Sequence, residues 1–428
     1  MNAMQEDERM PIYDKVIGIL FRPKKGTIKT AAPEHAQVLE KAEGNLCPLP
    51  RAGAENIKRL WRLEIMIATD CNLNCGYCCA YGGNFGGGAQ VMQPAAAVTY
   101  LRELIAGKYD DVGTVMFFGG EPTTQPDTVK AICGFFEACI SEGILKSMPA
   151  FTMVTNGTLL DSGLIETICR YDIKVAVSVD GSPQANDMLR IDRAGNGTFD
   201  KIAEGIDNLR AAGNPPRMLV ATYTSLHERA GVSKSDVMEF LKSRFGISKI
   251  MVADCSPAKE EDALACILRN PAPCRDRFAF DTDVIREAGL GRRVASIFYD
   301  DIVCGAGLTS AALLPDGKLY PCRVFAGREQ FCMAHYNGQA FDFTDYPKVM
   351  QRLRMSSKST NSVCRGRRPK TLCGICPAVL QLSMDAQHDE ISCSHEKMNF
   401  TLRLLAPAKE KAGPKDWNER RGRSAYIL

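Results

Sequence analysis

The sequence has little of what marks membrane proteins and nucleic-acid-binding proteins. Its 428 residues contain no apolar run of about 18 residues or more, so no membrane span and no membrane partner are expected. The formal net charge is only +3, which gives no reason to expect a nucleic-acid partner. The first residues, MNAMQEDERMPIYDK, are acidic where a secretory signal is basic and then apolar, so we expect a cytoplasmic location.

What is present is typical of a folded globular chain. Hydrophobic residues make up 45% of the sequence and charged residues 24%, whereas a disordered chain is poorer in apolar residues. The length exceeds that of one average domain. We therefore expect a large catalytic domain with smaller parts attached to it.

The sequence has 18 cysteines, which are not expected to form structural disulfides in a reducing cytoplasm. They should be core thiols, metal ligands or catalytic thiols. Cys133, Cys139 and Cys169 lie in apolar helical patterns, which predicts small buried side chains. Most of the others fall into two dense groups, at 71–79 and at 304–393.

Short apolar runs alternate with helical patterns between residue 63 and about 255. Strands are predicted at 63–69, 114–120, 151–157, 174–181, 218–224 and 249–255, because nearly continuous apolar runs are typical of a parallel sheet covered on both faces. Helices are predicted between them at 95–107, 128–143, 162–171, 198–213 and 234–246. This alternation predicts an α/β barrel or partial barrel, in which functional groups follow the carboxyl ends of the strands.

The first cysteine group directly follows the first predicted strand. Cys71, Cys75 and Cys78 supply three thiolates within eight residues, which would satisfy three irons of a [4Fe–4S] cluster and leave the fourth iron open. A zinc site is the alternative. Zinc takes four ligands, usually as CxxC pairs, and Cys79 is poorly placed to be the fourth because it adjoins Cys78.

The CxxxCxxC spacing resembles the signature of the radical S-adenosylmethionine (SAM) superfamily, and further motifs follow in order. FFGGEPT (117–123), TNG (155–157) and SVDG (178–181) resemble family motifs at successive strand ends. The run DMLRIDRAGNGTFDKIAEGI (187–206) resembles the stretch that follows in peptide-modifying members. The resemblance covers roughly residues 60–260. It implies a partial (β/α)6 barrel, a [4Fe–4S] cluster on the three cysteines and SAM contacts at Tyr77, Gly119, Gly120, Glu121, Asn156, Ser178, Asp180 and Arg190.

The second cysteine group resembles the SPASM extension of radical SAM peptide maturases. Cys304 and Cys322 flank a glycine at 317, and further cysteines follow. The resemblance implies one or two auxiliary [4Fe–4S] clusters, the first held by Cys304, Cys322 and Cys376 and the second by Cys364, Cys373 and Cys393. Asn361 stands where the family has a cysteine, so six thiolates align where two clusters could take eight. Cys332 is a possible seventh ligand, although REQFCMAHYNG predicts a strand with Cys332 packed in it. The CxxC of Cys373 and Cys376 keeps a zinc site open.

These patterns predict three regions: an N-terminal segment at 1–60 that could be a reduced leader-peptide-binding element, a radical SAM core at 61–290, and a SPASM-type domain with a basic tail at 291–428. A basic run between cluster cysteines is either a solvated loop or a contact for an acidic peptide. The run comprises Arg365, Arg367, Arg368 and Lys370.

The predicted function is maturation of a ribosomally synthesised peptide that carries a leader sequence. A 5′-deoxyadenosyl radical would remove a substrate hydrogen, and a peptide cysteine would then form a thioether there. An electron donor such as flavodoxin or ferredoxin is implied, and the sequence singles out no catalytic base. Carbon–carbon crosslinking, formylglycine formation of the sulfatase-maturing type, and a non-catalytic iron–sulfur or zinc protein remain open alternatives.

Overall fold

The computed structural model describes residues 57–85, 87–255, 278–280, 305–355 and 378. Two compact units divide the chain. Nearly all described residues belong to the unit formed by Glu55–Val284, Gly305–Gln351 and Ala412–Leu428. The predictions for 1–56, and for every auxiliary-cluster cysteine except Cys322, lie outside the described residues.

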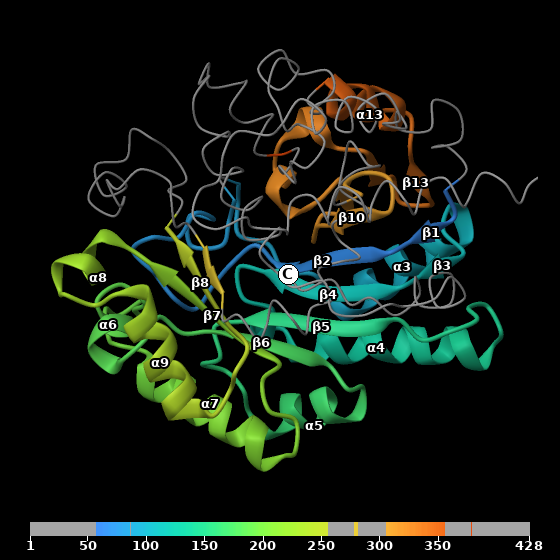
Figure 1. Ribbon diagram of the computed structural model, residues 1–428. Helices are drawn as coiled ribbons and strands as arrows, with labels where there is room; N and C mark the ends of the chain where they lie inside the picture. The colour runs from blue at the N-terminus through green and yellow to red at the C-terminus, as the bar shows by residue number, and fades with distance from the viewer. Residues whose placement is uncertain (1–56, 86, 256–277, 281–304, 356–377, 379–428) are drawn as a thin grey trace, which may run out of the picture. The chain divides into compact units, whose positions relative to one another are not determined.

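A mixed sheet forms the centre of this unit. Six parallel strands lie side by side in chain order, as Figure 1 shows from blue to yellow. They are β2 (Arg62–Ala68), β4 (Thr114–Gly119), β5 (Ala150–Thr155), β6 (Lys174–Ser178), β7 (Met218–Tyr223) and β8 (Ile250–Asp254). β9 (Phe278–Phe280) runs antiparallel to β8. A small separate parallel pair consists of β1 (Arg59–Leu60) and β3 (Asp111–Val112).

Helices connect the parallel strands. The longer ones are α3 (Pro94–Gly107), α4 (Pro126–Ser141), α5 (Ser162–Arg170), α7 (Phe199–Ala211) and α9 (Lys234–Phe245). Short helices α6 (Pro183–Asp187) and α8 (Ser225–Arg229) follow β6 and β7. The six predicted strands and five predicted helices are all present, which confirms the predicted α/β fold. In the part of the chain that the structure describes, no helix is both long and apolar enough to cross a membrane.

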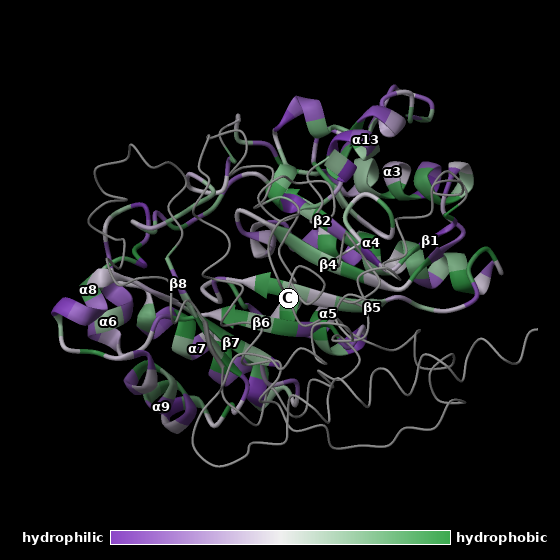
Figure 2. Cartoon of the chain, turned by 45° about the horizontal axis from the view of Figure 1, so that its top comes forward, coloured by the Kyte–Doolittle hydropathy of each residue, from purple (hydrophilic) through white to green (hydrophobic). Residues whose placement is uncertain are grey.

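The two faces of the sheet differ in their surroundings. Phe117 of β4 stacks on Phe151 of β5 with ring centroids 5.9 Å apart, and Phe151 in turn meets Phe136 of α4 at 6.0 Å. Side chains alternate along a strand, so Phe118 and Thr152 point to the opposite face, and both are only half-buried. Helix α4 therefore packs on the face that holds Phe117 and Phe151, and Figure 2 shows the green of apolar residues along the strands of the sheet. On the opposite face Met66 and Met116 are buried, so that face is open only in part.

The segment after residue 305 joins the same sheet. β10 (Ser310–Leu313) pairs in parallel with β2, and β11 (Lys318–Tyr320), β12 (Ala334–Tyr336) and β13 (Phe341–Asp342) continue the sheet as antiparallel strands. Helix α13 (Tyr346–Met355) follows. Backbone pairing thus binds part of the predicted 291–428 region to the core sheet, while the domain boundaries themselves stay predictions.

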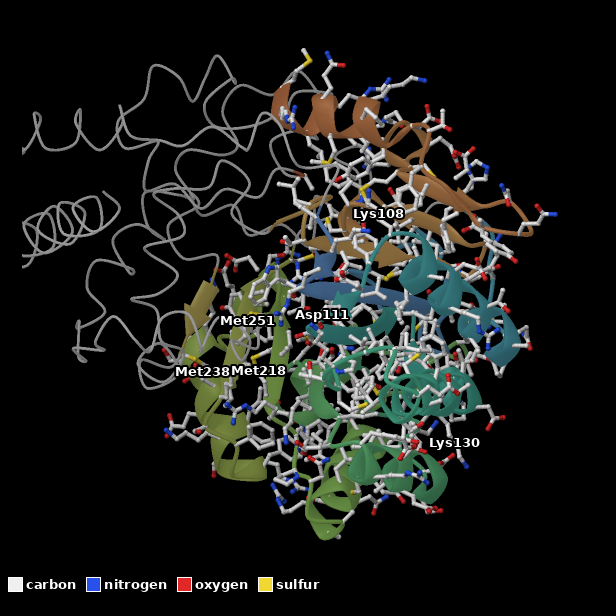
Figure 3. The ribbon with its side chains drawn as sticks, turned by 90° about the vertical axis from the view of Figure 1, so that its right-hand side faces the viewer. Lys108, Asp111, Lys130, Met218, Met238 and Met251 are labelled. Carbon is white, nitrogen blue, oxygen red and sulfur yellow. The ribbon has the colours of Figure 1, made fainter. Side chains whose placement is uncertain are left out.

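An aromatic contact also holds this segment to the core. Lys108, at the end of α3, places its ammonium 4.7 Å from the ring centroid of Phe343 and 4.2 Å from that of Tyr346. Figure 3 labels Lys108 where α3 meets the orange-brown segment. An ammonium over aromatic faces is attractive, so the contact favours this packing.

Two predictions about single cysteines are wrong. Cys332 does not lie in a strand, because it follows the 3-10 turn η4 (Glu329–Phe331) and precedes β12. Its half-buried thiol donates to the carbonyl oxygen of Ala334 at 3.4 Å. Cys169 is exposed rather than buried, because it lies in the last turn of α5, whereas Cys133 and Cys139 are buried as predicted.

Candidate active site

The loop after β2 presents three half-buried cysteines: Cys71, Cys75 and Cys78. The loop lies against the segment 189–192, since the backbone N–H of Asn74 donates to Ile191 at 2.8 Å and that of Gly76 donates to Leu189 at 2.9 Å. The N–H of Cys78 closes a turn onto the carbonyl of Cys75 at 3.0 Å. These backbone contacts fix the loop independently of any side chain.

Cys75 and Cys78 lie close enough to Cys71 for their charges to affect its ionisation. Burial raises the pKa of Cys71 to about 12 and that of Cys75 to about 11, although the charge of Arg190 opposes the shift at Cys75. Such thiols stay protonated at neutral pH unless a metal displaces the proton.

The donor set suits a cluster better than a single ion. Among the described residues, no three His, Cys, Asp or Glu side chains converge closely enough to hold one metal ion. A zinc ion needs its ligands to meet at one point, whereas a [4Fe–4S] cluster takes each thiolate on a different iron. Three neighbouring thiols could each take a different iron of such a cluster.

Two glycines bring the end of β4 against the end of β2. A Cβ on Gly119 would lie 2.3 Å from the carbonyl oxygen of Ala68, and a Cβ on Gly120 would lie 2.2 Å from that of Asp70. The N–H of Gly120 donates to Ala68 at 2.7 Å, and the N–H of Glu121 donates to Asp70 at 2.9 Å. Only glycine fits this approach, which places the GGEP backbone directly beside the cysteine loop.

The carboxylate of Glu121 is buried and fully hydrogen-bonded. Oε1 accepts from the N–H and hydroxyl of Thr123 at 3.1 and 2.7 Å and from the hydroxyl of Thr155 at 2.7 Å, while Oε2 accepts from the N–H of Asn156 at 2.7 Å. Burial raises the pKa of Glu121, and these donors oppose the rise. The side chain thus joins the end of β4 to the end of β5.

The side chain of Asn156 contacts the cysteine loop. Its Nδ2 donates to Oδ1 of Asn72 at 2.8 Å and to Sγ of Cys71 at 3.8 Å. Its Oδ1 accepts from the N–H and hydroxyl of Thr158 at 3.0 and 2.7 Å. Nδ2 of Asn72 also donates to the Thr158 hydroxyl at 2.9 Å, so Asn72, Asn156 and Thr158 form a closed network.

A second buried network lies at the end of β6. Asp180 forms an ion pair with Arg190, with Nε to Oδ2 and Nη2 to Oδ1 distances of 3.3 Å, and accepts from the N–H of Thr222 at 2.8 Å. The hydroxyl of Tyr77 also donates to Asp180, and the guanidinium of Arg190 lies 5.6 Å from the centroid of the Tyr77 ring. Burial keeps the pKa of Tyr77 well above its usual range, so the phenol remains the donor. Ser178, at the end of β6, is half-buried.

Sequence reasoning missed several polar groups around this site. His227 is buried with Nε2 3.2 Å from the carbonyl oxygen of Asp180, and it belongs to the capping box of α8. Glu64, fully buried in β2, accepts from the N–H and Nη1 of Arg323 at 3.0 and 2.8 Å. Cys255 directly follows β8, and its place at a predicted strand end is the one signal that could have identified it.

The predicted residues at the ends of β4, β5 and β6 therefore lie around the loop that follows β2. The family model of the radical SAM superfamily matches residues 65–241. This part of the chain is a radical SAM domain. Its cofactors are SAM and a [4Fe–4S] cluster.

Curated proteins match the radical SAM domain at low sequence identity. The radical SAM cyclopropyl synthase TigE of Paramaledivibacter caminithermalis is 24% identical over 226 residues, which are 49% of this chain and 44% of TigE. The chain thus spans about half the length of the curated relatives it matches.

Solved structures share the fold at low identity. Native anSMEcpe with bound AdoMet superposes with a TM-score of 0.57 at 16% identity, covering 81% of this chain and 96% of that one. Streptococcus suis SuiB bound to the precursor peptide SuiA superposes with a TM-score of 0.54 at 16% identity, covering 92% of this chain and 88% of SuiB. At such identity the superpositions show the fold alone.

Of the six aligned auxiliary-cluster cysteines, only Cys322 is among the described residues. It is buried and lies two residues after β11. The other predicted ligands, Cys304, Cys364, Cys373, Cys376 and Cys393, stay predictions.

Proposed function

We propose that this chain is a radical SAM maturase of a ribosomally synthesised peptide and that it forms a thioether from a peptide cysteine. The observation that carries the proposal is the cysteine loop after β2, held between the ends of β4, β5 and β6 within a radical SAM domain. The peptide class rests on the cysteine pattern at 304–393 and on the fold shared with SuiB, which was solved with a precursor peptide.

The cofactors supply the radical. When bound, the cluster and SAM together would supply a 5′-deoxyadenosyl radical. Cys71, Cys75 and Cys78 would hold the cluster, and the GGEP backbone at Gly119 and Gly120, which lies beside their loop, would contact SAM. Arg190, which is paired with Asp180, is the one positively charged residue among the predicted SAM contacts.

Thioether formation is a two-electron oxidation of the peptide. The radical takes one hydrogen atom from a substrate carbon, the substrate thiol loses a proton, and the carbon–sulfur bond forms as one electron leaves. An auxiliary cluster on the C-terminal cysteines would accept that electron, and flavodoxin or ferredoxin would supply the electron that starts the next turnover. Each crosslink therefore removes two hydrogens from the peptide.

The test is a reconstituted enzyme incubated anaerobically with a reductant, SAM and a small Cys-rich candidate peptide from a neighbouring reading frame. We expect 5′-deoxyadenosine and a peptide lighter by two hydrogens per crosslink, with cysteines that resist alkylation. Cys71→Ala should abolish both products, and Cys169→Ala, which changes an exposed thiol on α5, should retain them.

The outcomes separate the alternatives. A lighter product whose cysteines all remain alkylatable would replace the thioether with a carbon–carbon crosslink. Formylglycine at a serine or cysteine would instead indicate the sulfatase-maturing type of reaction. Zinc without acid-labile sulfide in the wild-type protein would reject the whole proposal.

A further inference from the structure

The amide of Asn156 uses its entire hydrogen-bonding capacity within the protein. An asparagine side chain has two N–H donors and two acceptor positions on its oxygen. Both donors are used, on Asn72 and Cys71, and both acceptor positions are used by Thr158. The residue is 6% exposed, and its own backbone N–H is held by Glu121. A direct side-chain contact with SAM would have to break one of these bonds.

We propose that Asn156 is a positioning residue that holds the sulfur of Cys71 and raises the reduction potential of the radical-generating cluster. This inference rests on the proposed function and deepens it. Hydrogen bonds to cluster sulfurs stabilise the reduced, more negative state and so shift its potential upward. Cys71 receives two such bonds, from the N–H of Leu73 at 3.4 Å and from the Asn156 amide at 3.8 Å.

The network of Asn72, Asn156 and Thr158 also explains why Nδ2 of Asn156 keeps pointing toward the sulfur of Cys71. Asn72 lies next to Cys71 in the loop, and its amide binds both Asn156 and Thr158. Thr158 donates twice to the Asn156 oxygen, which fixes the orientation of the amide. The end of β5 and the cysteine loop are therefore joined through the planar amide of Asn156, whose rotation is blocked.

The decisive variant is Asn156→Asp, which keeps the shape and the acceptor toward Thr158 but replaces the donor with a carboxylate oxygen. Asn208→Asp is the matched control, because it makes the same change of charge on an exposed position of α7. The measurements are the midpoint potential by EPR-monitored titration, the iron and sulfide content, the SAM dissociation constant, and the rate of 5′-deoxyadenosine formation.

We expect Asn156→Asp to lower the midpoint potential and to slow SAM cleavage about tenfold at a fixed reductant potential, the size expected for one lost hydrogen bond to a charged group. Iron content and SAM affinity should stay near those of wild type. The control should match wild type in all four measurements.

A different result would overturn the inference. An unchanged potential with SAM binding weakened tenfold or more would make Asn156 a direct SAM contact, as the family resemblance predicts. If Asn156→Asp does not fold, Thr158→Val, which changes no charge, should lower the potential by a smaller amount because the amide loses one anchor. An unchanged potential in that variant would also overturn the inference. Absence of acid-labile sulfide in the wild type would reject the proposed function before any variant is compared.

Discussion

At the residue scale, the polar side chains at the strand ends are bound mainly to one another. Glu121 and Asp180 each accept hydrogen bonds at both oxygens from protein donors, and the amide of Asn156 is fully used. These residues lie in the motifs that the sequence singled out. In the structure these residues connect the strand ends to the cysteine loop. A sequence motif does not show these connections, because residue spacing does not identify hydrogen-bond partners.

Glu121→Gln should destabilise the protein by about 1–3 kcal/mol. A glutamine has an NH2 group in place of one oxygen, so that group would face either the N–H of Asn156 or the donors of Thr123 and Thr155, leaving a buried donor unsatisfied. Urea unfolding under anaerobic conditions would measure the loss. Glu137→Gln, on the exposed surface of α4, is the control and should destabilise the protein much less, because solvent screens exposed ion pairs. Equal effects at the two positions would argue against the connecting role of Glu121.

At the residue scale, a sequence is informative where several possible ligands lie close together. Three cysteines in eight residues singled out the loop as a candidate site. His227 and Glu64 were not identified, because a single histidine in a helical pattern or a glutamate in an apolar strand gives no signal until its distant partner is known. Those partners, the carbonyl of Asp180 and the side chain of Arg323, lie 47 and 259 residues away.

At the element scale, the six parallel strands and their helices could be predicted because both faces of the sheet impose nearly continuous apolar runs. The antiparallel strands β11, β12 and β13 are two or three residues long, too short for a clear pattern. This explains why Cys332 was assigned to a strand and instead lies between a 3-10 turn and β12.

Close packing of α7 against the turn after β5 gives a prediction at this scale. A Cβ on Gly205 of α7 would lie 2.3 Å from the carbonyl oxygen of Gly157, next to Asn156. Gly205→Ala should therefore push α7 away and lower the free energy of unfolding by about 1–3 kcal/mol. Thermal and urea unfolding would measure the change.

The matched control is Gly134→Ala in the middle of α4, where the nearest atom to a new Cβ is the Tyr171 hydroxyl at 4.0 Å. It should stabilise the helix by roughly 0.5–1 kcal/mol, because alanine has the higher helix propensity. Stabilisation by both substitutions would show that α7 can move away from Gly157 at little cost.

At the scale of the whole molecule, the cluster should contribute to stability as well as to chemistry. Three half-buried thiols with two raised pKa values gain a partner when iron binds, and a ligand that binds only the folded state stabilises it. Anaerobic removal of iron by a chelator should lower the melting temperature by about 5 °C or more. Differential scanning calorimetry before and after chelation would test this.

The triple variant Cys71→Ala, Cys75→Ala, Cys78→Ala is the comparison. It lacks the proposed ligands, so chelation should change its melting temperature less than that of wild type. If chelation lowers the melting temperature equally in both proteins, the stabilising metal is bound by other cysteines. The iron content of the triple variant would then report the auxiliary clusters directly.

The pairing of β10 with β2 has a consequence for how the protein is made. Ser310 and Arg62 are partners across the two strands. That edge of β2 therefore stays uncovered until about 250 further residues have been synthesised. At 5–20 residues per second, a ribosome needs roughly 12–50 s to synthesise them. During that interval the strand that leads into the cysteine loop has an open edge, a known route to misassembly. Slower translation or a lack of chaperones should therefore reduce the yield of folded protein before any cluster is inserted.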